Sequence, residues 1–165
     1  MKKLISSIIA IVFALNISAY AEEKLTIEKQ LVGIVGAISG TVKTETRELK
    51  AGDKIYLNET IYAGVGAGTQ ILLLDQSTFT IGEDSEVVMD TFVFDPETND
   101  GKIVASVKQG SLKVISGLIS KKNPDSLTVE VPEGTLGSRG TEFQTIVSKG
   151  KTDTLLIGPG KNNTL

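Results

Sequence analysis

The chain has 165 residues and contains no cysteine, no histidine and no tryptophan. Without histidine it cannot form a Ser-His-Asp or Cys-His triad. Without cysteine it has no thiolate nucleophile, no disulfide and no cysteine-ligated zinc or iron–sulfur site. Its 17 basic and 20 acidic residues give a formal net charge of −3, which argues against a basic nucleic-acid-binding domain. We therefore expect a non-enzymatic protein that has no cofactor and no nucleic-acid partner.

The first 21 residues have the pattern of a bacterial export signal. Two lysines follow the initiator methionine, and the stretch 4–17 is almost wholly apolar. Ala19 and Ala21 give the small-x-small pattern that signal peptidase accepts, so cleavage would leave Glu22 as the new N-terminus. The apolar run is shorter than the roughly 20 residues of a spanning helix, although an uncleaved anchor is the alternative. We predict a periplasmic or secreted protein with no transmembrane segment after cleavage.

The rest of the chain has the pattern of an all-β domain. Turn-forming residues recur about every 8–12 residues, a spacing typical of such domains. Strands are predicted over 31–38, 40–46, 54–57, 61–62, 69–74, 78–81, 86–94, 102–108, 112–116, 127–131, 142–147 and 152–157. A turn is expected at Gln109-Gly110, and the only helix considered is a short one over 22–30. The expected fold is therefore all-β, with short strands stacked in two facing sheets, in a solenoid-like or jelly-roll-like form.

Six short motifs occur in order along this domain. They are a Gly-Asp turn, an Ala-Gly step, an Asp-x-Ser hairpin, a Gly-x-Leu strand, a Val-Pro step and a Gly-Thr-x-Phe strand. The residues that carry them are Gly52, Asp53, Gly64, Asp75, Ser77, Gly110, Pro132, Gly140, Thr141 and Phe143. Together they resemble the FecR domain family over about Val32 to Val147. The resemblance implies a β fold, favours its solenoid form, and suggests a role in envelope signalling.

The sequence departs from the family pattern at three positions. Gln76 stands where the hairpin glycine usually sits, Val131 replaces the threonine before the proline, and Ala63 replaces the threonine of a Thr-Gly step. Full-length FecR-type regulators look like a cytoplasmic anti-sigma segment followed by a membrane helix and a periplasmic domain. This chain resembles a stand-alone periplasmic module instead. The expected organisation is a signal peptide over 1–21, a lead-in over 22–30, a FecR-like domain over 31–157 and a tail over 158–165.

The motif residues are expected to shape the fold rather than to bind a ligand. Glycine supplies positive φ, aspartate and serine bond neighbouring amides in turns, and proline ends a strand. Arg139 with Glu142 is the one polar pair that could contact an acidic or carboxylate ligand, and a local ion pair is the favoured alternative. Asp95, Glu97 and Asn99 have the spacing that begins a calcium loop, but the pattern then fails. We therefore predict no metal site.

Three functions fit these observations. The leading hypothesis is a non-enzymatic binding or scaffolding module that acts through a protein partner in the periplasm, since an exposed strand edge suits docking. The alternative is a carbohydrate- or cell-wall-binding module, which would need an exposed aromatic platform. Most tyrosines and phenylalanines lie in strand patterns and are expected in the core. A hydrolase that uses only carboxylates, such as Asp53, Asp75 and Glu86, is the least favoured.

Overall fold

Alternation of apolar and polar residues produces most of the strands in the computed structural model, which describes residues 29–137 and 142–158. Along β5 (Gly68–Leu73) and β6 (Thr78–Ile81), every second side chain is buried, among them Ile71 and Phe79. This period of two places the apolar side chains on one face of the sheet. The positions between them, most of them polar, face outward. One face of β5 and of β6 therefore belongs to the core.

The described residues form a sheet of twelve strands with one short α-helix and one 3-10 turn. The strands are β1 (Leu31–Ser39), β2 (Val42–Lys43), β3 (Lys54–Tyr56), β4 (Thr60–Ala63), β5, β6, β7 (Ser85–Phe94), β8 (Gly101–Ile115), β9 (Leu127–Val131), β10 (Gly134–Gly137), β11 (Glu142–Ser148) and β12 (Lys151–Gly158). The helix α2 spans Leu118–Lys122, and the 3-10 turn spans Pro124–Ser126. No helix in these ranges is long and apolar enough to cross a membrane.

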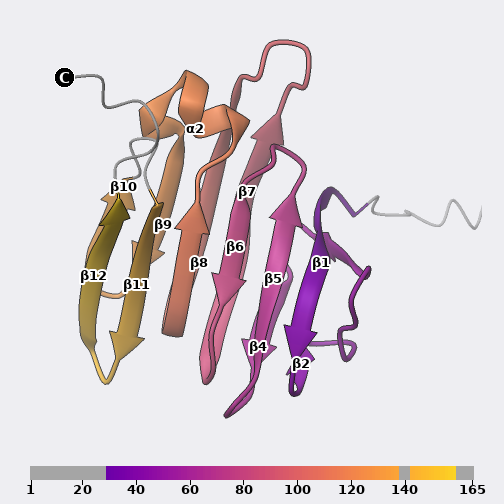
Figure 1. Cartoon of the computed structure of the whole chain (residues 1–165), viewed down its shortest axis with the longest axis vertical. Helices are drawn as coiled ribbons and strands as arrows, with labels where there is room; N and C mark the ends of the chain where they lie inside the picture. The colour runs from indigo at the N-terminus through magenta and orange to yellow at the C-terminus, as the bar shows by residue number, and fades with distance from the viewer. Residues whose placement is uncertain (1–28, 138–141, 159–165) are drawn as a thin grey trace, which may run out of the picture.

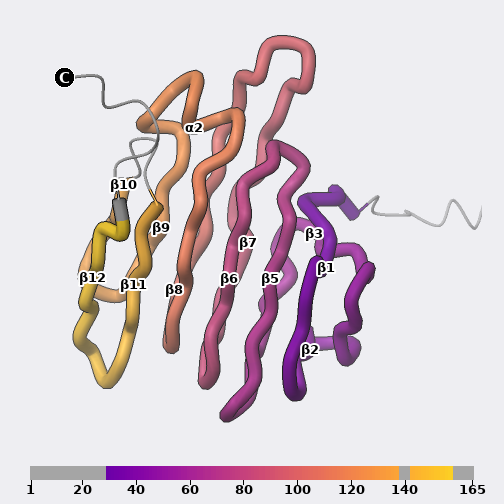
Figure 2. The backbone as a smooth tube through the Cα atoms, viewed as in Figure 1, coloured from indigo at the N-terminus to yellow at the C-terminus, as the bar shows by residue number. Residues whose placement is uncertain are grey.

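The sheet curls into a half-barrel around β8, as Figure 1 shows. The first part of β8 pairs with β7 antiparallel and with β9 in parallel, and β7 continues to β4 and β2. Its last part pairs with β6 and β11, from which the sheet continues to β5, β1 and β3 on one side and to β12 on the other. We call the first set of strands the back half and the second the front half. The tube in Figure 2 shows the two halves one behind the other.

Gly110 is the point at which β8 passes from one half to the other. The residue before it, Gln109, pairs with Glu86 of the back half, and Gly110 itself pairs with Val147 of the front half. Its φ of +86° bends the strand without ending it. The predicted turn at Gln109-Gly110 is therefore wrong, because hydrogen bonding continues through this position along one 15-residue strand.

The core lies between the two halves and is built from aliphatic side chains, three phenylalanines and a methionine. Its fully buried members include Val32, Ile55, Ile61, Ile71, Phe79, Met89, Ile103, Leu112, Ile119 and Leu127. Burying a side chain of this size stabilises the fold by roughly 1.5–3 kcal/mol. Since the chain has no cysteine, this burial and the backbone pairing hold the domain together.

The expected all-β class with two facing layers is confirmed, and its specific form is a half-barrel. The solenoid form is not shown, because every strand pair among the described residues is antiparallel except β8 with β9. Two elements were missed. The helix α2 lies between the predicted strands 112–116 and 127–131, and its five residues are too few for a helical period to be visible. The strand β10 lies between the predicted strands 127–131 and 142–147, where no strand was predicted.

Candidate binding surfaces

The Gly-Asp and Ala-Gly motifs lie in turns and make backbone contacts. Gly52 has a φ of +90°, and the Asp53 carboxylate accepts the backbone N–H of Lys50 (2.8 Å). The N–H of Gly64 donates to the carbonyl of Thr41 (3.1 Å), which joins β4 to the segment before β2. These contacts hold the chain to itself, as expected for turn residues.

The Asp-x-Ser motif joins the β5–β6 hairpin to the start of α2. Asp75 is fully buried, and its carboxyl oxygens accept the backbone N–H (3.0 Å) and the hydroxyl (2.8 Å) of Ser77. The same carboxyl group lies 3.4 Å from the N–H of Ile119, and the Ser77 hydroxyl accepts the N–H of Gly117 (2.9 Å). A side chain with no exposed surface cannot reach a substrate. Asp75 is therefore excluded from a carboxylate-based hydrolase site.

The remaining predicted residues lie toward the ends of the described ranges. Phe143 is buried in the core, and Pro132 is exposed in the turn between β9 and β10. Glu142 pairs with Lys113 of β8, whose Nζ lies 2.5 Å from Oε1. Arg139, the predicted partner of Glu142, lies outside the described residues. So do the signal cleavage site (Ala19, Ala21 and Glu22) and part of the last motif (Gly140 and Thr141).

An ion pair between Arg47 and Glu59 was missed by the sequence analysis. The Arg47 guanidinium donates to both Glu59 oxygens, at 2.6 and 3.1 Å, and Glu59 also accepts the N–H of Tyr56 (3.1 Å). The hydrogen bond to Glu59 raises the pKa of Arg47 above its ordinary value. The Glu59 side chain is only 9% exposed. This pair therefore fastens the long segment between β2 and β3 to the sheet, and its role is structural.

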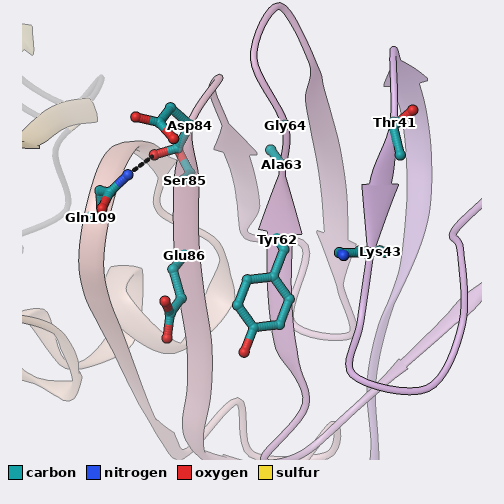
Figure 3. Close-up of a pocket in the computed structure, with 9 residues that line it drawn as sticks. All are labelled: Thr41, Lys43, Tyr62, Ala63, Gly64, Asp84, Ser85, Glu86 and Gln109. Atoms are coloured by element: carbon teal, nitrogen blue, oxygen red, sulfur yellow. Dashed lines mark hydrogen bonds between the residues drawn. The ribbon is translucent and has the colours of Figure 1, made fainter.

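A shallow groove crosses the outer face of the back half. Four side chains form a row along it, because Lys43 of β2 pairs with Tyr62 of β4, Tyr62 with Glu86 of β7, and Glu86 with Gln109 of β8. The groove has a volume of about 330 Å³. Its remaining lining residues are Thr41, Ala63, Gly64, Asp84 and Ser85. We call this row and its surroundings the outer groove, and Figure 3 shows its side chains.

The charges around the outer groove nearly balance. Glu86 forms an ion pair with Lys108 on β8, with 3.1 Å between Oε1 and Nζ. The hydrogen bond from this pair raises the pKa of Lys108 above its ordinary value. Lys43 on one side of the groove offsets the charge of Asp84 on the other. No group of three or more acidic side chains in the described ranges is arranged to hold a metal ion.

The last strand, β12, presents an exposed edge. Among the described residues it pairs only with β11. Three consecutive apolar residues near its end are exposed, at 64% for Leu155, 71% for Leu156 and 42% for Ile157. A row of unpaired backbone groups beside apolar side chains is a ready site for an added strand. We call this surface the β12 edge.

A family model described as FecR protein matches residues 59–157, which is more than half of the chain. No curated protein and no solved structure matches the chain significantly. The family match begins at β4, yet β1 pairs with both β3 and β5, so the preceding strands belong to the same sheet. The match to the FecR model shows that this chain belongs to the FecR family, which is generally non-catalytic.

Proposed function

We propose that this chain is an exported, non-enzymatic FecR-like module that binds an extended segment of a partner protein at the β12 edge. The observation that carries the proposal is the row of exposed apolar residues on a strand with one free side. Backbone hydrogen bonds from an added strand would supply affinity, and its alternating side chains would supply specificity.

The β12 edge lies at the open end of the half-barrel. Leu156 is opposite Phe143 and so faces the inner side, whereas Leu155 is opposite Gln144 and faces the outer side. The edge strand of the back half, β10, lies nearby, where the Thr152 hydroxyl donates to the Glu133 carboxylate (Figures 1 and 2). A partner strand with apolar residues at alternate positions would therefore cover Leu156 and extend the core toward β10.

The β12 edge can be tested by site-specific photo-crosslinking in cells. A crosslinking amino acid at position 155 is expected to capture a protein in the envelope fraction, and the substitution Leu156→Lys is expected to abolish that crosslink. The same amino acid at position 72 is the control, since Leu72 is 41% exposed but lies on a central strand with both sides paired. Equal capture at both positions, or capture that survives Leu156→Lys, would contradict docking at this edge.

Export is supported by the N-terminal sequence. The positive start, the apolar run and the small residues Ala19 and Ala21 together predict cleavage before Glu22. Intact-mass measurement of the protein recovered from the periplasmic fraction is expected to give a chain that begins at Glu22. A mass that still includes residues 1–21, or recovery only from the cytoplasm, would refute export.

A further inference from the structure

Tyr62 presents an aromatic surface in the outer groove. Its neighbours in the core-facing positions of β4, Ile61 and Ala63, are buried, whereas Tyr62 points to the opposite face and is only half-buried. Figure 3 shows its ring face on, with Lys43 to one side and Glu86 to the other. The other half-buried tyrosine, Tyr56, is covered by the Arg47 guanidinium, 5.9 Å from its ring centre. Among the described residues, Tyr62 is therefore the half-buried tyrosine with no cation placed over its ring.

The groups around this ring can hydrogen-bond hydroxyls in both directions. The Glu86 carboxylate accepts, the Gln109 amide both donates and accepts, and the Lys43 ammonium donates. Gln109 already donates to the carbonyl of Asp84 (3.2 Å), which fixes its orientation. A sugar ring has the complementary surface, with an apolar face of C–H groups and a rim of hydroxyls. A half-buried aromatic ring beside polar side chains offers an apolar face and hydrogen-bonding groups that match these two parts of a sugar.

The balance of charge favours a neutral ligand. Lys43 and Lys108 supply two positive charges, and Asp84 and Glu86 supply two negative ones. A strongly acidic or basic ligand would be attracted by two of these charges and repelled by the other two. Neutral hydroxyls have no such penalty, because each can be satisfied by hydrogen bonds alone.

A second hollow continues from the outer groove around the bend of β8 at Gly110. It has a volume of about 550 Å³ and shares Asp84 and Gln109 with the first. Beyond them it is lined by Glu83, Gly110, Ser111, Gln144 and residues of the β11–β12 hairpin, Lys149 among them. A ligand of several units can therefore extend from the ring of Tyr62 into this hollow.

We propose that the outer groove binds a neutral oligosaccharide of β-linked hexopyranose units, with one ring stacked on Tyr62 and its hydroxyls bonded to Glu86 and Gln109. Rings whose substituents are all equatorial have the flattest C–H faces, which suits one exposed aromatic ring. This site is separate from the β12 edge and does not depend on partner docking there.

The site can be tested by NMR titration of the isotopically labelled mature chain with cellotetraose and with the tetramer of N-acetylglucosamine. We expect shifts of the backbone signals of Lys43, Tyr62, Glu86 and Gln109, with a Kd on the order of 0.1–1 mM, as suits an open groove. Stronger binding of the N-acetylated tetramer would point to a cell-wall glycan, and equal binding to recognition of the ring alone.

Substitutions at position 62 separate stacking from hydrogen bonding. Tyr62→Ala is expected to raise the Kd at least about tenfold, whereas Tyr62→Phe, which keeps the ring, should change it less than about threefold. Gln109→Ala removes one hydroxyl partner without touching the ring and keeps the test valid if Tyr62→Ala fails to fold. Leu156→Lys should leave glycan binding unchanged.

Some results would overturn the proposal. It fails if neither tetramer shifts the four signals at 10 mM, if the shifts lie elsewhere, or if a folded Tyr62→Ala variant binds as well as the parent. These outcomes leave the β12 proposal untouched. A row of cross-strand pairs that only stabilises the sheet would predict a lower melting temperature for these variants and no response to either sugar.

Discussion

Replacing Gly110 with alanine is expected to destabilise the domain by about 3–5 kcal/mol, enough to unfold much of it at 37 °C. Two effects add. The φ of +86° is strained for any residue with a Cβ atom. A Cβ atom placed there would also collide with Cα and Oγ of Ser85 and lie 2.6 Å from the carbonyl oxygen of Asp84, whereas real Cβ contacts essentially never fall below 3.0 Å. Neither neighbour can retreat easily, since Glu86 pairs with Gln109 on one side of this point and the N–H of Ser111 donates to the Ser85 hydroxyl on the other.

Gly52→Ala is the matched control for this prediction. Gly52 has nearly the same φ, +90°, but nothing lies within 4 Å of the position that its Cβ would occupy. It should therefore show the conformational cost alone, about 1–2 kcal/mol. Urea unfolding followed by circular dichroism measures both variants. If Gly110→Ala costs no more than Gly52→Ala, the close approach of β7 to β8 at Gly110 is not a constraint on the fold.

The alternation of side chains predicted most strands because that alternation is a local property. The bounds of β6 and β9 agree with the predicted ranges 78–81 and 127–131, where apolar residues occupy every second position without interruption. Glycine and aspartate residues also predicted the turns around β5 and β6 correctly, because turn preference is a local property too. The all-β class followed from local chemistry alone.

The passage of β8 between the two halves was missed, although the sequence carries a sign of it. Ile103, Ala105 and Val107 are buried at odd positions, whereas Leu112 and Val114 are buried at even ones. This change from odd to even buried positions means that the strand has bent or bulged between the two runs, and it does not require a turn. Gly110 lies in that interval, and its freedom at positive φ allows the bend.

The outer groove could not be assembled from the sequence for a different reason. Lys43, Tyr62, Glu86 and Gln109 share no motif, and they become neighbours only through the registers of four strands. Alternation along β4 shows that Tyr62 faces away from Ile61 and Ala63, but β4 is so short that the sequence does not show which face is the core. The β12 edge is similar, since a free edge depends on which strands pair and not on the strand itself.

Asp75→Ala is expected to cost about 3–5 kcal/mol, the loss typical of a buried polar group whose partners are left without it. The Asp75 carboxyl group accepts the N–H and hydroxyl of Ser77 and lies within reach of the N–H of Ile119. None of these donors can turn to water, because Ser77 and Ile119 are both fully buried. The substitution should therefore loosen the β5–β6 hairpin and the start of α2 together, and hydrogen exchange should rise in both segments.

Two further variants separate burial from local turn chemistry. Asp75→Asn keeps one acceptor oxygen and places an amide group where the Ser77 hydroxyl and the Ile119 N–H now donate, so it should cost less than alanine but still about 1–3 kcal/mol. Asp95 makes the same local contact with the backbone N–H two residues ahead (2.9 Å), but on an exposed loop. Asp95→Ala should leave the urea midpoint almost unchanged, since water replaces the lost acceptor. A similar loss of stability on substituting Asp75 and Asp95 would mean that the Asp-x-Ser hairpin contributes turn geometry alone. A large loss of stability only at Asp75 would mean that its carboxyl group joins two segments more than 40 residues apart.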